Sequence, residues 1–265
     1  MPGCAFRPAL IPILFENLSV IEVWEHIADW YLGEDGGRRL ARFARVTPIT
    51  LHCLTLSVGS EASAQALERA EAVGALARAS GVDHVSDHLA FSRVGATTLP
   101  HFVPLWRTED QLELVARNVE RLQSQFGVPL LLENPAAPLD PGGDMSTAEF
   151  LNRLCARTGC QVLLDLENVR VNAANGLVDA AAELRELDLG NVGGIHLAGG
   201  TDPDEDGPAF DAHAWPVRDI VMGWLAQVLP QAPNCRWVVF ERDGRLEEGA
   251  EVLADLDRLC RALGR

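Results

Sequence analysis

The sequence predicts an α/β barrel, and three observations lead to that fold class. Several short apolar runs show no alternation with polar residues, as is typical of strands buried on both faces of a parallel sheet. Segments of helical composition or spacing separate these runs, which indicates right-handed β-helix-β crossovers. Six of the runs stop on a histidine or a carboxylate: His52, His88, Glu133, Asp165, His196 and Glu241. We therefore expect a (β/α)8 barrel of the triosephosphate isomerase (TIM) type, in which all strand ends share one rim.

The expected strands cover residues 49–52, 85–88, 130–134, 162–165, 194–196 and 237–241. Residues 20–24 are expected to form the first strand, and residues 4–7 could supply the eighth strand that closes the barrel. A chain of 265 residues suits one closed barrel, and no linker or repeat divides it. Residues 1–265 are thus expected to form a single domain.

The helices are predicted from composition, spacing and capping residues. The segment 61–80 is rich in Ala, Glu and Arg and stops at Gly81. Two capping boxes, Thr108 with Gln111 and Ser146 with Glu149, open helices that stop at Gly127 and Gly159. Further helices are expected within 40–46, 178–187, 217–229 and 247–263. The acidic loop 199–212 is expected to be a solvated excursion or a lid.

Composition excludes several classes of function. A formal charge of −16 without a basic run opposes nucleic-acid binding, and no apolar run is long enough to cross a membrane. All 22 basic residues are arginine, so enzymes that need a catalytic or phosphate-binding lysine are excluded. The six cysteines are scattered without a C-x-x-C pair, which favours reduced thiols in a cytoplasmic protein.

The polar residues at the strand ends are candidate metal ligands. Two carboxylates about 4 Å apart repel by roughly 4 kcal/mol at an effective dielectric constant near 20, so they need either a shared proton or cations. The histidines beside them favour cations, and nitrogen and oxygen donors without a thiolate suit iron, manganese or zinc. Loops add Asn168, Asp211 and His213 to the six strand-end residues. Nine donors exceed the needs of one ion and fit two or three.

Other polar residues have simpler interpretations. His84 is expected to be structural, because its distance from His88 along a strand is about 13 Å. His26 and His101 are expected to face solvent. Cys53 follows His52 and should therefore point into the packing on the opposite face of the strand. For Glu22, lining of the barrel and a structural role stay equally open.

Several motifs occur in a fixed order along the chain. They are 85–91 (Val-Ser-Asp-His-Leu-Ala-Phe), 132–135 (Leu-Glu-Asn-Pro), 164–169 (Leu-Asp-Leu-Glu-Asn-Val), 175–176 (Asn-Gly), 196–199 (His-Leu-Ala-Gly), Asp211-x-His213 and 240–243 (Phe-Glu-Arg-Asp). Together they resemble the multinuclear non-haem iron-dependent oxidases, the family of the methanobactin biosynthesis oxidase. The resemblance runs from about Phe6 to Asp243.

The resemblance implies a TIM-type barrel with two or three iron ions, of mixed Fe2+ and Fe3+ state, and O2 as co-substrate. It implies oxidation of residues, often cysteine, in ribosomally made precursor peptides, together with a separate protein that recognises the leader of the precursor. By this likeness His52, His88 and Glu133 hold one iron, and Glu133 bridges to a second iron held by Asp165, His196 and Glu241. Asn168, Asp211 and His213 would serve a third. His52, Glu133 and Asp211 are the residues expected at the reacting centre.

The chain departs from the family pattern at three places. Gly200 stands where relatives often carry histidine, Glu167 replaces a common asparagine, and residues 136–138 (Ala-Ala-Pro) replace a more polar stretch. These departures leave the substrate open. The alternative function is a divalent-metal barrel of the sugar epimerase or isomerase kind or a phosphodiesterase, and a non-catalytic alternative is a metal-dependent scaffold.

Overall fold

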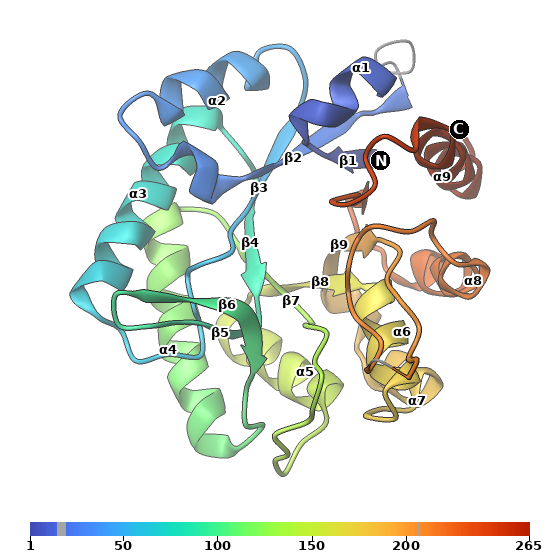
Figure 1. Ribbon diagram of the computed structural model, residues 1–265. Helices are drawn as coiled ribbons and strands as arrows, with labels where there is room; N and C mark the ends of the chain where they lie inside the picture. Colours follow the sequence, from blue (N-terminus) through green and yellow to red (C-terminus); the bar gives the residue numbers. More distant parts are fainter. Residues whose placement is uncertain (15–19, 206) are drawn as a thin grey trace.

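The protein folds into a closed barrel of parallel strands, as predicted. The computed structural model describes residues 1–14, 20–205 and 207–265. Around the barrel the strands follow the order β1-β10-β9-β8-β7-β4-β3-β2 (Figure 1). Their bounds are β1 Pro2–Ala5, β2 Val23–Ile27, β3 Ile49–His52, β4 Val85–His88, β7 Leu130–Glu133, β8 Gln161–Asp165, β9 Val192–Leu197 and β10 Trp237–Phe240. The TIM-type architecture is therefore confirmed.

Helices surround the barrel as an outer layer (Figure 1). The α-helices are α1 Ile11–Leu14, α2 Gly36–Ala44, α3 Ala64–Ser80, α4 Glu109–Phe126, α5 Thr147–Thr158, α6 Leu166–Ala174, α7 Ala180–Glu186, α8 Asp219–Val228 and α9 Gly249–Ala262. Short 3-10 turns lie at Pro8–Leu10, Ala28–Tyr31, Leu189–Asn191 and Leu229–Gln231. None of the helices in the described ranges is both long and apolar enough to span a bilayer.

The predicted helix boundaries follow from their capping residues. The side chains of Ser63, Thr108 and Ser146 each accept a hydrogen bond from the backbone N–H three residues later, at the starts of α3, α4 and α5. At the other ends of these helices, three glycines adopt the left-handed conformation that side chains disfavour. These are Gly81, Gly127 and Gly159.

Two predicted strands are displaced from their expected positions. The first strand was predicted at residues 20–24, but β2 begins at Val23 and ends at Ile27. Glu25 and His26 are both buried and lie inside this strand rather than after it. The eighth strand is supplied by Pro2–Ala5 rather than by residues 4–7, and β1 pairs with both β2 and β10.

Two elements of the structure were not predicted. The segment after β4 forms an antiparallel hairpin of β5 Ala90–Val94 and β6 Thr97–Pro104 beside the barrel (Figure 1). The helix α6 begins directly after β8, where the side chain of Asp165 accepts a hydrogen bond of 2.6 Å from the N–H of Asn168. Asn168 therefore lies in the first turn of a helix rather than in a loop.

The remaining single-residue predictions have mixed outcomes. The prediction of a solvent-facing His26 is wrong: its ring stacks on Phe6, and Nδ1 lies 2.9 Å from the Tyr31 hydroxyl, which leaves no path to solvent. His101 is exposed and Cys53 is buried, as predicted. Glu22 does not line the barrel, because it pairs with Arg265 at 3.2 Å.

His84 also has a local partner, since its Nδ1 lies 2.7 Å from Asp83 Oδ1 ahead of β4. The predicted loop 199–212 has no helix or strand among its described residues, and Asp206 lies outside them.

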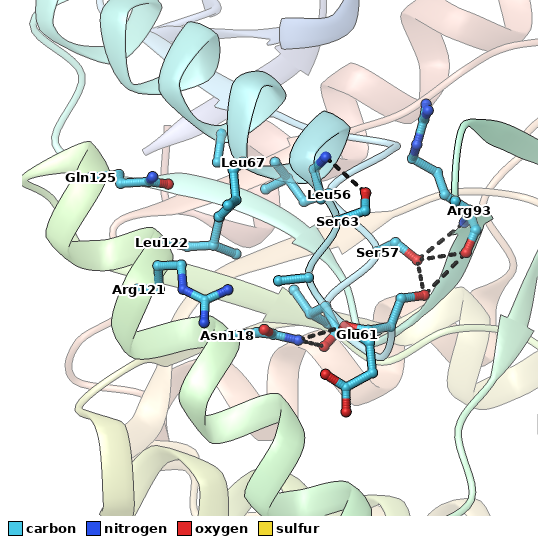
Figure 2. A pocket seen from close by; sticks show the side chains of 16 residues that line it. Leu56, Ser57, Glu61, Ser63, Leu67, Arg93, Asn118, Arg121, Leu122 and Gln125 are labelled. Atoms are coloured by element: carbon cyan, nitrogen blue, oxygen red, sulfur yellow. Dashed lines mark hydrogen bonds between the residues drawn. The ribbon is translucent and has the colours of Figure 1, made fainter.

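The loop after β3 is held against α4 and the hairpin by buried polar contacts. The side-chain amide of Asn118 donates hydrogen bonds of 2.9 and 2.8 Å to the carbonyl oxygens of Val58 and Ser60. Ser57 adopts a positive φ of 56°, and its hydroxyl accepts hydrogen bonds from the N–H groups of Ser92 and Arg93. Figure 2 shows the contact between Ser57 and Arg93. These contacts fix the chain directly after His52, the last residue of β3.

We expect Asn118→Leu to lower the free energy of unfolding by about 2–3 kcal/mol, because two buried carbonyl groups lose their donors. Urea unfolding followed by circular dichroism measures this loss. Arg117→Ala is the control on the same helix, because Arg117 is exposed and makes only a 3.8 Å ion pair with Glu113. It should change the free energy by no more than about 0.5 kcal/mol. Equal stabilities of the two variants would contradict this account of the loop.

Candidate metal centre

The barrel brings the strand-end donors to its carboxyl-terminal mouth. His52, His88, Glu133 and Asp165 are each the last residue of their strand, and Glu241 directly follows β10. His196 is paired with Asp165 in the register of β8 and β9. All strands of the barrel are parallel, so these side chains share one end of it. This is the face at which TIM-type barrels carry their active sites.

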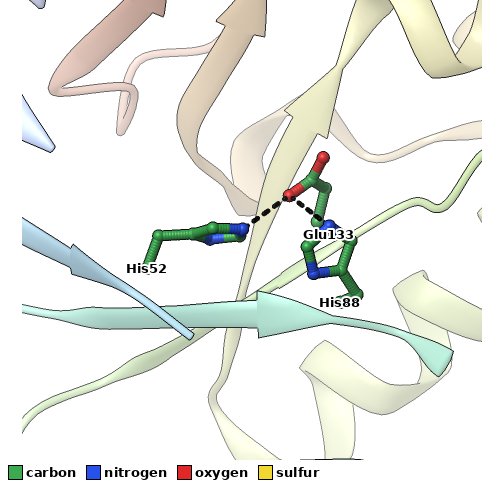
Figure 3. Close-up of side chains that lie close together, drawn as sticks. All are labelled: His52, His88 and Glu133. Carbon is green, nitrogen blue, oxygen red and sulfur yellow. Dashed lines mark ion pairs between the residues drawn. The ribbon is translucent and has the colours of Figure 1, made fainter. Parts of the chain in front are cut away.

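The first donor group consists of His52, His88 and Glu133 (Figure 3). Glu133 Oε2 lies 3.6 Å from His52 Nε2 and 3.5 Å from His88 Nε2. His52 Nδ1 lies 2.9 Å from the Ser86 hydroxyl, so this contact directs the other ring nitrogen toward Glu133. All three side chains are almost fully buried.

A second donor group shares Glu133 with the first and adds Asp165 and His196. His196 Nδ1 lies 3.7 Å from Glu133 Oε2 and 3.0 Å from Glu241 Oε2. The opposite nitrogen, Nε2, lies 3.0 Å from Glu25 Oε1. His196 therefore turns one nitrogen toward the shared cluster and the other toward a carboxylate behind it.

A third donor group contains Asp165, His213 and Glu241. His213 Nδ1 lies 3.5 Å from Glu241 Oε2, and His213 Nε2 lies 2.7 Å from Asp211 Oδ1. His213 adopts a positive φ of 46°, an uncommon backbone conformation for a residue other than glycine. The strained backbone turns the Asp211-x-His213 motif toward the strand ends.

Asn168 completes the set from the start of α6. Its amide nitrogen donates to Glu133 Oε1 at 3.2 Å and to the Asn134 carbonyl at 3.0 Å. Its amide oxygen is buried without a hydrogen-bond partner. The structure thus gathers all nine residues singled out in the sequence at one mouth.

The charges of the cluster depend strongly on one another. Burial would raise the pKa of Glu133, but His88, His196 and His52 outweigh burial and lower that pKa to about 2. Burial opposes the protonation of His196, yet Glu241, Glu25 and Glu133 raise its pKa well above the usual value. The neighbouring carboxylates favour the protonated imidazoles of His88 and His196, whose pKa values are raised despite burial. Arg7 adds a further positive charge 3.6 Å from Glu241.

Asp165 has no comparable compensation. Burial raises its pKa well above the usual value, and the carboxylates of Asp211 and Glu133 raise it further. Its Oδ2 lacks a hydrogen bond, as do Glu133 Oε2 and Asn168 Oδ1. Buried oxygen atoms without partners cost free energy unless a cation or donor meets them. The donor set therefore fits metal ions bound between these side chains.

Glu25 was not among the predicted site residues, but it is buried and belongs to a fourth donor group with His196 and Glu241. The sequence could have indicated Glu25, because it follows an apolar run as the other carboxylates do. It was not predicted because the first strand was placed three residues too early. Asp243, which pairs with Arg7 and lies 3.4 Å from His213 Nδ1, was part of a quoted motif but was given no role.

Comparison with known proteins identifies the family. The model of the RiPP precursor modification enzymes MbnB/TglH/ChrH matches residues 1–263. The chain belongs to this family. Among its relatives is a UPF0276 protein of Bordetella bronchiseptica, 33% identical and covering 99% of this chain and 92% of the relative. Another is a UPF0276 protein of Rhizorhabdus wittichii, 37% identical and covering 83% and 79% of the two chains. Membership supports a precursor-modifying enzyme.

Solved structures agree on the fold. A xylose isomerase domain protein from Planctomyces limnophilus superposes with a TM-score of 0.64 at 12% identity, covering 98% of this chain and 95% of that one. The IOLI protein with a bound zinc atom gives 0.63 at 13% identity and covers 98% of both chains. Endonuclease IV from Thermus thermophilus gives 0.56 at 18% identity, covering 97% and 98%. At these identities the likeness is one of barrel architecture alone.

Glu167 and Gly200, two positions singled out in the sequence, contact each other in the structure. Glu167 Oε1 accepts hydrogen bonds of 2.7 Å from the N–H of Gly200 and 2.8 Å from Nε of Arg170. A Cβ atom at Gly200 would clash with the Phe210 carbonyl oxygen and would lie 2.8 Å from Glu167 Oε1. A histidine therefore does not fit at position 200 beside Glu167 without a shift of the backbone.

We expect Fe2+ or Zn2+ to raise the melting temperature by about 5 °C, because a ligand at 100 times its Kd stabilises the native state by about 2.7 kcal/mol. Glu133→Gln should lose most of this rise, since Glu133 belongs to two donor groups. Thermal unfolding with and without metal, together with metal content by mass spectrometry, measures both effects. Glu22→Gln, at the other end of the barrel, is the control and should behave as wild type. An unchanged metal content in Glu133→Gln would contradict the assignment.

Proposed function

We propose that the protein is a multinuclear non-haem iron oxidase that uses O2 to modify residues, cysteine foremost, of a ribosomally synthesised precursor peptide. The observation that carries the proposal is the overlap of several nitrogen and oxygen donor groups in a chain of the MbnB/TglH/ChrH family. Overlapping groups that share Glu133, Asp165, His196 and Glu241 suit neighbouring ions better than one isolated ion. The absence of thiolate donors among these groups favours iron, manganese or zinc.

The first donor group corresponds to one proposed iron site, in which His52, His88 and Glu133 would hold the ion. Asp165, His196 and Glu241 would hold a second iron together with Glu133, although the geometric groups place Glu241 with Asp165 and His213 as well. Asn168, Asp211 and His213 would serve a third. Two or three irons in mixed Fe2+ and Fe3+ states would supply the one-electron chemistry with O2 that side chains lack.

The surrounding residues orient these ligands. Ser86 holds His52 Nδ1, which leaves Nε2 for the metal, and Glu25 does the same for His196 through Nε2. Arg7 pairs with Asp243 and lies 3.6 Å from Glu241, so it offsets part of the negative charge. Asp211 borders both His213 and an open cavity, where a substrate can approach. We therefore assign His52, Glu133 and Asp211 to the reacting centre.

The proposal includes further expectations about partners and location. We expect a separate protein to recognise the leader of the precursor, and we expect the enzyme to act in the cytoplasm. Neither nucleic acid nor membrane is an expected partner, because the chain carries a formal charge of −16 and the described residues contain no helix suited to a bilayer.

The decisive test is O2-dependent modification of a peptide. The genes beside this one are searched for a short reading frame that contains cysteine. The peptide that it encodes is co-expressed with the protein and analysed by mass spectrometry. We expect a mass change that requires iron and O2, with O2 uptake by anaerobically purified, iron-loaded protein once peptide is added. Glu133→Gln should lower the rate at least 100-fold. Full activity with zinc alone would overturn the redox proposal and favour the epimerase, isomerase or phosphodiesterase alternative.

A second test concerns Glu25. Glu25→Ala should weaken metal binding about 10–100-fold, because His196 loses the carboxylate that orients it. Glu25→Gln keeps an oxygen that can accept a hydrogen bond from Nε2 and should recover part of the affinity. Competition with a coloured chelator measures both constants. If the alanine variant binds metal as wild type does, Glu25 has no orienting role.

A further inference from the structure

An apolar cavity of about 530 Å³ opens directly beside the candidate metal centre. His88, Asn168 and Asp211, which belong to the nine candidate ligands, form part of its wall. Most of the rest comes from the β5–β6 hairpin, the loop after β7 and the loop before Asp211, and the loop after β3 and α6 add Leu54, Thr55 and Val171. Its volume lies within the range of pockets that enclose a ligand.

Large apolar side chains form part of the cavity wall. Phe102 of β6 stacks on the imidazole of His88 with ring centroids 3.6 Å apart and an angle of 20° between the ring planes. Leu139 and Phe210 also line the cavity and are 58% and 48% exposed. Exposed large apolar groups that converge on one cavity indicate a binding site for an apolar group.

The few charged residues in the wall indicate which kind of group the cavity binds. Among the described residues that line the cavity there is one carboxylate, Asp211, and no arginine. A phosphate group would find no arginine to pair with there.

We propose that this cavity binds the residue next to the modified residue of the peptide substrate and selects a large apolar side chain there. The proposal rests on the proposed function, because it assumes that the reacting residue lies at the metal centre. Phe102 is the residue that determines the selection. It contacts the occupant on one side and His88 on the other, and His88 Nε2 faces Glu133 at 3.5 Å.

The test is peptide binding without turnover. Dye-labelled synthetic peptides Gly-X-Cys-X-Gly, with Phe, Leu, Ser or Asp at both X positions, cover a neighbour on either side of the cysteine. Their affinity for anaerobic, iron-loaded protein is measured by fluorescence anisotropy. We expect the Phe and Leu peptides to bind about 10–100-fold more tightly than the Ser and Asp peptides, which corresponds to burial of one large apolar side chain.

Substitutions locate the preference within the protein. Phe102→Ala should reduce the preference about 10-fold, and Phe102→Leu should retain most of it. Val94→Ala is the matched control on the same hairpin, because Val94 is 67% exposed and does not line the cavity. It should keep the full preference. A melting temperature for each variant separates lost selectivity from lost folding.

The outcomes separate this proposal from the proposed function. Equal binding of all four peptides, or no binding of any, overturns the apolar selection. A preference that persists in Phe102→Ala overturns the role of Phe102. Selective binding together with no O2-dependent mass change would leave the pocket intact and contradict the oxidase. An O2-dependent mass change without selective binding would support the oxidase and contradict the apolar pocket.

Discussion

The structure depends on the burial of several carboxylates at one mouth of the barrel. Glu133 lies at the centre of this arrangement, with His52, His88 and His196 within 3.7 Å of its Oε2. Imidazoles can offset the charge of Glu133, but Asp165 has burial and two carboxylates acting against its ionisation. Desolvated charges of this kind are expensive unless something positive lies between them. The donor groups at this mouth therefore suit a cation, and their burial is costly to the fold unless a positive group lies between them.

Barrel topology makes this concentration possible at a low cost in chain length. Four of the parallel strands, β3, β4, β7 and β8, contribute their last residue to the same rim. The ligands thus sit on rigid strand ends rather than on flexible loops, as the registers of β4 with β7 and of β8 with β9 indicate. A loop contributes the Asp211-x-His213 motif, and the β5–β6 hairpin contributes the apolar wall around Phe102.

The fold and the donor set could largely be predicted because both follow from local signals. Apolar runs without alternation define buried parallel strands, and Ser or Thr caps with terminal glycines define helices. Glu25 and His26 escaped prediction because two buried polar residues inside a strand have the same appearance as the end of one. The hairpin escaped for a related reason: Thr97–Pro104 is mostly exposed and contains two prolines, so it lacks the hydrophobic pattern of a barrel strand. Contacts between distant segments, such as the stacking of Phe102 on His88, cannot be predicted from a local sequence pattern.

Glu167, Arg170 and Gly200 illustrate how the surroundings of a cluster can change while its ligands stay in place. The carboxylate of Glu167 accepts hydrogen bonds from the Arg170 side chain and from the N–H of Gly200. The same Arg170 guanidinium donates hydrogen bonds to Asp202 and to the Thr201 carbonyl oxygen. The loop that starts at Gly200 is thereby tied to α6, the helix that carries Asn168. The N–H of Thr201 donates a 2.8 Å hydrogen bond to the carbonyl oxygen of Phe210, which lines the cavity. One network of hydrogen bonds therefore connects the apolar wall of the cavity with the helix that carries the candidate ligand Asn168. A change at Gly200 would therefore act on the wall of the cavity and on α6 together. Under the proposed function, such a change would alter the selection of the substrate through the loop that ends at Phe210.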